Sequence, residues 1–124
     1  MQLESIHHMA INVFDYARAK EFYVNLLGFQ VLGEYTFPSG TRRMDCQLGS
    51  ARLEIFHTAK AVNRPDEPFL GYRHLCFKPA DIRQTVAELR AAGVEVEEIR
   101  PDPMAGGLMT FFKDPEGLIL ELHE

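Results

Sequence analysis

Two histidines and two glutamates recur at matching places in this 124-residue sequence. Glu54 follows His8 by 46 residues, and Glu121 follows His74 by 47. Aliphatic residues flank both glutamates, so each carboxylate is expected on the opposite face of its strand, with little solvent. Two such carboxylates repel one another and lose hydration, and a divalent cation removes both penalties. The pattern predicts one metal site formed by His8, Glu54, His74 and Glu121.

Mixed nitrogen and oxygen donors suit nickel, cobalt, zinc, manganese or ferrous iron rather than calcium. Four protein ligands leave room for water at an octahedral ion, and an open position is typical of a catalytic metal. A simpler alternative stays open for each glutamate, which could form a salt bridge with Arg52, Arg73 or Lys113 instead of binding a metal. His7 is the main rival of His8 as a ligand, although its strand register predicts that it faces the helix side.

Both halves of the sequence predict the same order of elements, a strand, a helix and three strands. His8 and His74 each precede a helix-capping aspartate by seven residues, Asp15 in the first half and Asp81 in the second. The first helix is expected to run to Leu27 and the second to Ala92. The predicted strands are residues 6–13, 29–37, 43–48, 51–57, 72–78, 94–99, 108–113 and 118–123.

These elements predict an α+β fold built from paired βαβββ modules within a single domain, residues 1–124. Module one covers about residues 1–58 and module two about residues 72–124, with a Pro-containing linker at 59–71. His57 and His123 end their strands and are expected at the surface. Cys76 shares the strand parity of His74, so it either lines the same face or is inert packing.

Composition excludes several classes of protein. The net charge of −5 is spread without long basic runs, so a nucleic-acid partner is not expected. The first residues lack the basic and apolar regions of a signal peptide, and no apolar stretch could cross a bilayer. Cys46 and Cys76 lack a Cys-x-x-Cys spacing and are expected as free thiols of the cytoplasm.

The motifs together resemble those of the vicinal oxygen chelate superfamily, which includes glyoxalase I, bleomycin-resistance proteins and dioxygenases. The resemblance runs nearly end to end and is strongest to small glyoxalase I-like bacterial proteins of the YaeR type. The segments that carry it are His8–Val13 followed by Asp15, Ala19–Tyr23, Leu26–Phe29, Arg73–Phe77 and Phe112–Glu121.

The resemblance implies that the two modules form a cup-like mixed sheet around the metal, in a homodimer. It assigns His8, Glu54, His74 and Glu121 as the ligands, with nickel, zinc or cobalt favoured over manganese or iron. It implies a lyase or isomerase that chelates adjacent oxygens of a small α-hydroxycarbonyl-type substrate and moves a proton through an enediolate. Glu121 is then the favoured base and Glu54 the second candidate. Glu54 favours the glyoxalase-like branch, because the related epimerases usually carry Gln there.

Three positions depart from glyoxalase I. The family typically has Arg at the place of Asn12, Asn at the place of Thr58 and, in some members, Arg at the place of Leu70. Losing guanidinium groups removes strong contacts to a carboxylate, so the glutathione clamp is not carried over. Two other classes stay open: a non-catalytic binder resembling bleomycin-resistance proteins, and a metal-dependent dioxygenase, which usually has three protein ligands.

Overall fold

The computed structural model describes residues 1–60, 62 and 70–124. The chain divides into two compact units, unit 1 at Met1–Val62 and unit 2 at Asn63–Glu124. Residues 61 and 63–69 of the predicted linker lie outside the described residues. Each unit has its own four-stranded mixed sheet and its own helical segment, which confirms the α+β class.

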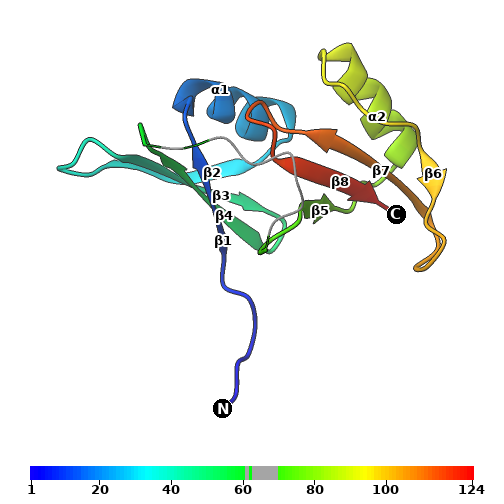
Figure 1. Cartoon of the computed structure of the whole chain (residues 1–124), viewed down its shortest axis with the longest axis horizontal. Coiled ribbons are helices and arrows are strands. Elements are labelled where there is room, and N and C mark those ends of the chain that lie inside the picture. The colour runs from blue at the N-terminus through cyan, green and yellow to red at the C-terminus, as the bar shows by residue number, and fades with distance from the viewer. Residues whose placement is uncertain (61, 63–69) are drawn as a thin grey trace. The chain divides into compact units, whose positions relative to one another are not determined.

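Unit 1 follows the predicted order of strand, helix and three strands (Figure 1). Its sheet has the order β1-β4-β3-β2, in which β1 runs parallel to β4 and the other pairs are antiparallel. Its elements are β1 (Met9–Val13), α1 (Tyr16–Lys20), the π-helical η1 (Glu21–Leu26), β2 (Gln30–Thr36), β3 (Arg42–Leu48) and β4 (Ala51–His57).

The helical segment of unit 1 begins where the sequence predicts but is not one regular α-helix. The Asp15 side chain accepts a hydrogen bond from the Arg18 amide, which caps the first turn. From Glu21 the segment becomes π-helical, and the Leu27 amide donates to the Phe22 carbonyl at 2.9 Å. This wider turn buries the neighbours Phe22 and Tyr23 together. Apolar periodicity alone does not distinguish the two helix types.

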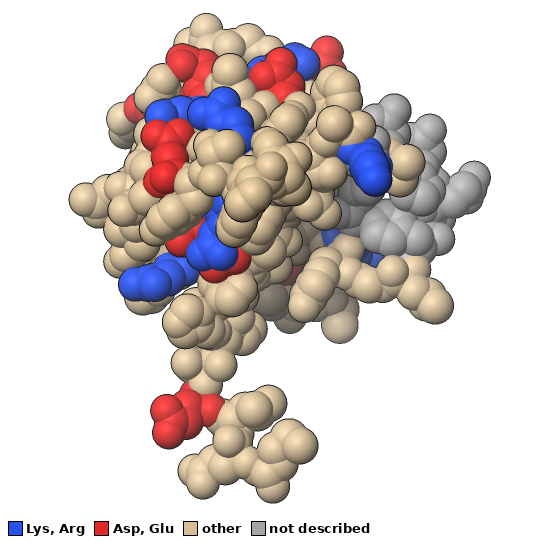
Figure 2. Space-filling view, turned by 90° about the vertical axis from the view of Figure 1, so that its left-hand side faces the viewer, with Lys and Arg blue, Asp and Glu red and all other residues tan. Residues whose placement is uncertain are grey.

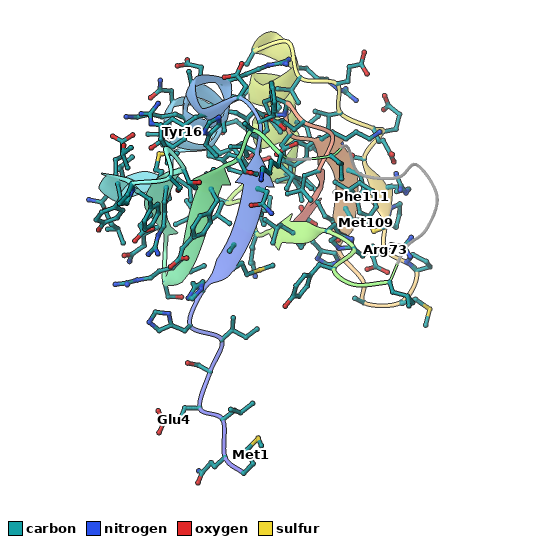
Figure 3. All side chains as sticks on the ribbon, turned by 60° about the vertical axis from the view of Figure 1, so that its left-hand side comes forward. Met1, Glu4, Tyr16, Arg73, Met109 and Phe111 are labelled. Atoms are coloured by element: carbon teal, nitrogen blue, oxygen red, sulfur yellow. The ribbon has the colours of Figure 1, made fainter. Side chains whose placement is uncertain are left out.

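Side chains also tie this helix to the edge of its sheet. Tyr16, labelled in Figure 3, donates from its hydroxyl to Glu34 Oε1 at 2.7 Å. Lys20 donates to the other oxygen of Glu34 at 2.8 Å, and the Arg42 guanidinium lies 3.9 Å from the centre of the Tyr16 ring. The lysine and tyrosine hydrogen bonds hold the pKa of Glu34 below its ordinary value.

Unit 2 repeats the order with a regular helix. Its sheet has the order β5-β8-β7-β6, again with the first pair parallel and the others antiparallel. Asp81 caps the helix by accepting from the amides of Arg83 and Gln84. The elements are β5 (Leu75–Phe77), α2 (Ile82–Ala91), β6 (Arg100–Pro101), β7 (Leu108–Lys113) and β8 (Ile119–His123).

Several strands are shorter than predicted. The first strand begins at Met9 rather than Ile6, and Figures 1 and 3 show residues 1–8 as an extended segment leading away from β1. The strand predicted at 72–78 is reduced to β5, and the one predicted at 94–99 to a single bridge at Val96, with β6 following it. Local alternation does not show where a strand finds a hydrogen-bonding neighbour.

The faces of the strands follow the predicted alternation. In β4, Leu53 and Ile55 are buried, and in β8, Leu120 and Leu122 are buried. The glutamates between these residues are therefore placed on the other face of each sheet. No helix in the described part of the chain is long and apolar enough to cross a membrane.

Candidate metal centre

The first His–Glu pair lies where β1 and β4 begin their parallel pairing. Ala10 is the register partner of Glu54, and His8 stands two residues before Ala10. His8 Nε2 is 3.7 Å from Glu54 Oε2. The imidazole is 40% exposed and the carboxylate 17%, so the histidine is the more open of the two side chains to solvent.

Glu54, on β4, also interacts with charged side chains of the neighbouring strand β3. Arg43 Nη2 donates to Glu54 Oε1 at 3.0 Å. The same guanidinium binds both oxygens of Asp45, at 2.5 Å from Nε and 2.8 Å from Nη2. The hydrogen bonds and charge of Arg43 hold the pKa of Asp45 below its ordinary value. Sequence reasoning offered Arg52 as the partner of Glu54 within this unit and missed Arg43.

The second His–Glu pair repeats this backbone placement in unit 2. Cys76 is the register partner of Glu121 across the parallel strands, and His74 stands two residues before Cys76. His74 Nε2 is 2.6 Å from Glu121 Oε2. Both side chains are more enclosed than those of unit 1, at 25% exposed for the histidine and 10% for the glutamate.

Glu121 is surrounded by different groups from those around Glu54. Its partner on the antiparallel side is Phe111, labelled on β7 in Figure 3, whose ring packs edge-on against His74 at 5.5 Å. Partial desolvation, together with the charge of Glu121 and a hydrogen bond to it, raises the pKa of the Cys76 thiol to about 11. Both cysteines are free, as predicted.

Each pair has donor atoms that fit a divalent cation. Metal–nitrogen and metal–oxygen bonds of about 2.1 Å place two donors of one ion roughly 3 Å apart. The two observed Nε2–Oε2 distances, 3.7 and 2.6 Å, lie on either side of that value. His74 Nδ1 is buried and has no hydrogen-bond partner among the described residues. Its other nitrogen therefore makes the polar contact of this ring.

The described residues contain no cluster of three or more His, Cys, Asp or Glu side chains that could hold a metal ion. Each unit by itself presents one His–Glu pair. The convergence of His8, Glu54, His74 and Glu121 on one ion, and the joining of the two sheets into a cup, stay predictions.

The other histidines differ from their predicted places in specific ways. His7 is exposed rather than turned to the helix side, and its Nδ1 lies 2.9 Å from His8 Nδ1. His57 is half-buried, with Nδ1 unpartnered among the described residues. His123 Nε2 lies 3.1 Å from Asp102 Oδ2, which ties the end of β8 to the loop at 102–107.

Acidic and basic side chains are interspersed on the face of the molecule drawn in Figure 2.

Asn12, at the place of a glutathione-binding arginine in the resembled family, is exposed on β1, and Leu70 is also exposed. Ile119 is exposed too, at 36%, although its strand parity predicts an enclosed position beside Glu121.

Comparison with known proteins places the sequence in one family. Residues 5–122 match the model of the Glyoxalase/Bleomycin resistance protein/Dioxygenase superfamily. The chain is 44% identical to YwkD of Bacillus subtilis, covering 100% of this chain and 99% of YwkD. It is 41% identical to YaeR of Escherichia coli, covering 98% and 97%. Both relatives are described as uncharacterized proteins.

Solved structures agree with this result. A glyoxalase family protein from Enterococcus faecalis is 47% identical, covers 100% of both chains and superposes with a TM-score of 0.92. The matched proteins include methylmalonyl-CoA epimerases and glyoxalase I, and fosfomycin resistance proteins share the fold. The chain belongs to the glyoxalase/bleomycin resistance/dioxygenase superfamily, the vicinal oxygen chelate superfamily that its motifs indicate.

Proposed function

We propose that this member of the superfamily is a divalent-metal-dependent lyase or isomerase of the glyoxalase I type. The observation that carries the proposal is the repeated His–Glu pair. In both units the histidine stands two residues before the parallel register partner of the glutamate. The substrate is a small molecule with adjacent oxygens, such as an α-hydroxycarbonyl compound.

The metal is held by His8, Glu54, His74 and Glu121, with nickel, zinc or cobalt favoured over manganese or iron. When bound, it acts as a Lewis acid that polarises a carbonyl oxygen and stabilises negative charge on the neighbouring oxygen. In a superfamily protein of the same fold, a fosfomycin resistance protein from Listeria monocytogenes, a crystal structure contains Mn(II).

The two glutamates have different tasks in this proposal. Arg43 bonds one oxygen of Glu54, so moving that carboxylate breaks a charge-assisted hydrogen bond. The ion pair of Glu121 is with His74, and the groups facing it across the sheet are Cys76 and Phe111. In line with the family resemblance, Glu121 is proposed as the base that moves a proton between neighbouring carbons, and Glu54 is the second candidate.

Named relatives support proton-transfer chemistry. Human mitochondrial methylmalonyl-CoA epimerase is 29% identical over 98% of this chain and 74% of its own length. A probable lactoylglutathione lyase from Synechocystis is 28% identical, covering 93% of this chain and 91% of the relative. Because Asn12, Thr58 and Leu70 replace the glutathione-binding residues of glyoxalase I, turnover is expected without a strict need for glutathione.

Metal reconstitution tests the proposal directly. Chelator-treated protein is loaded in turn with nickel, cobalt, zinc and manganese, and metal binding is measured before methylglyoxal is assayed with and without glutathione. We expect one metal ion per four-residue site and metal-dependent turnover of a vicinal dicarbonyl or α-hydroxycarbonyl compound. Protein that binds none of these metals contradicts the proposal, and strict glutathione dependence contradicts the expectation drawn from Asn12.

A second candidate function is non-catalytic binding of a small molecule. TnmS3, an antibiotic binding protein from Streptomyces, is 25% identical, covers 99% of this chain and superposes with a TM-score of 0.75. A binder without catalysis would gain no thermal stability from added nickel or zinc and would convert none of the assayed compounds. Metal content after purification without chelator separates the two candidates.

We also propose that the chain forms a homodimer, as the resemblance implies. Light scattering on a size-exclusion column measures the mass of the particle. A particle of 28 kDa, twice the 14.1 kDa chain, agrees with the dimer, whereas a monomer at micromolar concentration contradicts it.

A further inference from the structure

Arg43 hydrogen-bonds to Glu54, one of the proposed metal ligands. Its Nη2 atom binds Glu54 Oε1 at 3.0 Å, and the other oxygen, Oε2, is the one that faces His8 at 3.7 Å. The two oxygens of the Glu54 carboxylate therefore have different partners. Oε1 accepts a hydrogen bond from Arg43, and Oε2 faces the imidazole of His8.

Arg43 is itself held in place from two sides. Its Nε and Nη2 atoms bind the two oxygens of Asp45 on β3. Asp45 is the register partner of Glu54, which lies on β4. The aromatic rings of Tyr35 and Phe56 lie 5.7 and 5.5 Å from the guanidinium carbon. The Arg43 side chain is only 28% exposed. A forked, partly enclosed pair of this kind keeps its geometry better than an exposed ion pair.

The fold itself does not require this network. In unit 2 the register partner of Glu121 is Phe111, and the residue two positions earlier is Met109. These positions correspond to Asp45 and Arg43 in unit 1, and the sheet forms there with apolar side chains. The charged network therefore accompanies Glu54 specifically.

We propose that Arg43, pinned by Asp45, is a positioning residue that orients Glu54 so that Oε2 is presented, together with His8, to a divalent cation. The inference rests on the proposed function, because it takes Glu54 as a metal ligand. Its effect is to make Glu54 a fixed ligand bound through one oxygen, which leaves proton transfer to the other carboxylate. Partners that orient metal ligands in this way contribute about 10- to 100-fold to metal affinity.

The test compares Co(II) binding by the full-length apoprotein and its variants, followed by visible absorption and by competition with a chelator. The double variant Arg43→Met with Asp45→Asn removes the network, keeps the net charge and leaves no spare carboxylate to replace Glu54. We expect its Co(II) affinity to fall about 10-fold or more, with a changed absorption spectrum. Arg43→Lys keeps the charge without the fork, so we expect a smaller loss.

Arg42→Met is the matched control. It removes the same charge one residue away, where the guanidinium contacts Tyr16 instead of Glu54. We expect Co(II) affinity within about twofold of the native protein, since its side chain points to the other strand face. If the double variant does not fold, as judged by circular dichroism, Asp45→Asn alone carries the test, with a loss expected below about 10-fold because Arg43 still reaches Glu54.

The outcomes separate the two proposals. Native protein that binds neither Co(II) nor nickel, zinc or manganese overturns the proposed function itself. Native protein that binds Co(II), with the double variant matching it in both affinity and spectrum, overturns only the role of Arg43. An equal loss in the Arg42 control also overturns that role, because a general disturbance of β3 would then explain the effect as well as the loss of the bond to Glu54.

Discussion

In unit 1 the glutamate of the His–Glu pair is hydrogen-bonded to an arginine, whereas in unit 2 the corresponding glutamate lies beside a thiol and a phenyl ring. The backbone frames agree: each glutamate lies in the middle strand, between a parallel and an antiparallel neighbour. The surroundings differ in polarity, in exposure and in the distance from imidazole to carboxylate.

The repeated strand register gives the two glutamates equivalent backbone positions. The side chains around them differ, so the two carboxylates need not have the same chemical role. A charged network of Arg43 and Asp45 restrains Glu54, while the partners of Glu121 are the imidazole of His74, a thiol and a phenyl ring. A proton carrier must change its hydrogen bonds during a reaction, and a ligand that only binds metal need not. The difference between the units thus supports different roles for the two glutamates.

The largest expected effect comes from exchanging each glutamate for its amide. Glu121→Gln should lower turnover at saturating metal by at least about 100-fold, because a positioned general base contributes about 10²- to 10⁴-fold. It should largely keep its metal, since an amide oxygen can still bind. Glu54→Gln should lose less turnover at saturating metal, because Glu54 is only the second candidate for the base. Steady-state rates and metal titrations on both variants measure this, and an unchanged rate for Glu121→Gln refutes the assignment.

The register partners of the two glutamates give a second, smaller contrast, in stability. Phe111→Ala should lower the free energy of unfolding by about 2 kcal/mol. This is less than for a fully buried phenylalanine, because the ring is half-buried and packs on His74. Asp45→Ala at the matching position should cost about 1 kcal/mol or less, as expected for a partly exposed ion pair. Urea unfolding of both variants measures the difference. Equal costs would show that the two surroundings do not differ in packing.

In unit 1, Tyr16→Phe removes the hydrogen bond from the helix to Glu34. We expect this variant to lower the free energy of unfolding by about 1 kcal/mol. The pKa of Glu34 is lowered in the folded state, so its contribution is complete above 4.5 and is lost as pH falls through the folded pKa. The variant and the native protein should therefore converge in stability in acid. Tyr35→Phe, at a half-exposed ring, is the control and should change little at any pH.

The smallest effect concerns His123, the histidine that ends β8. Bonds to the Glu124 carbonyl and to Asp102 raise the pKa of His123 above its ordinary value of 6.5. Their stabilising contribution is complete below that value and is lost as pH rises through the folded pKa. Asp102→Asn should lower the pKa of His123, as NMR titration of its ring can measure. An unshifted titration would show that Asp102 does not stabilise the charged ring.

Much of the fold could be predicted from the sequence because it depends on local signals. Asp15 and Asp81 cap the helices as predicted, and β4 and β7 have the predicted bounds. Strand β6 and the start of β1 were predicted wrongly, because pairing depends on a neighbour that local alternation does not reveal. The pairing of His8 with Glu54 follows from a parallel register that the repeat indicates only indirectly.

The surroundings of the glutamates were harder to predict. Arg43 and Asp45 share a strand face two residues apart, but the bond of Arg43 to Glu54 becomes apparent only once β3 is placed beside β4. A signal was nonetheless present in the sequence. Aligning the two halves sets Arg43 and Asp45 against Met109 and Phe111, and a charged pair facing an apolar pair at a repeat position marks a functional difference.

His8 stands at the end of the exposed segment formed by residues 1–8, whereas His74 is already within bonding distance of its glutamate. In the proposed site this difference sets an order of events. If the two pairs share one cation, the pair of unit 2 would bind it first, and tight binding would require the ordering of His8, at an entropic cost. Release would then begin with His8, and the N-terminal segment would govern how long the metal ion stays bound.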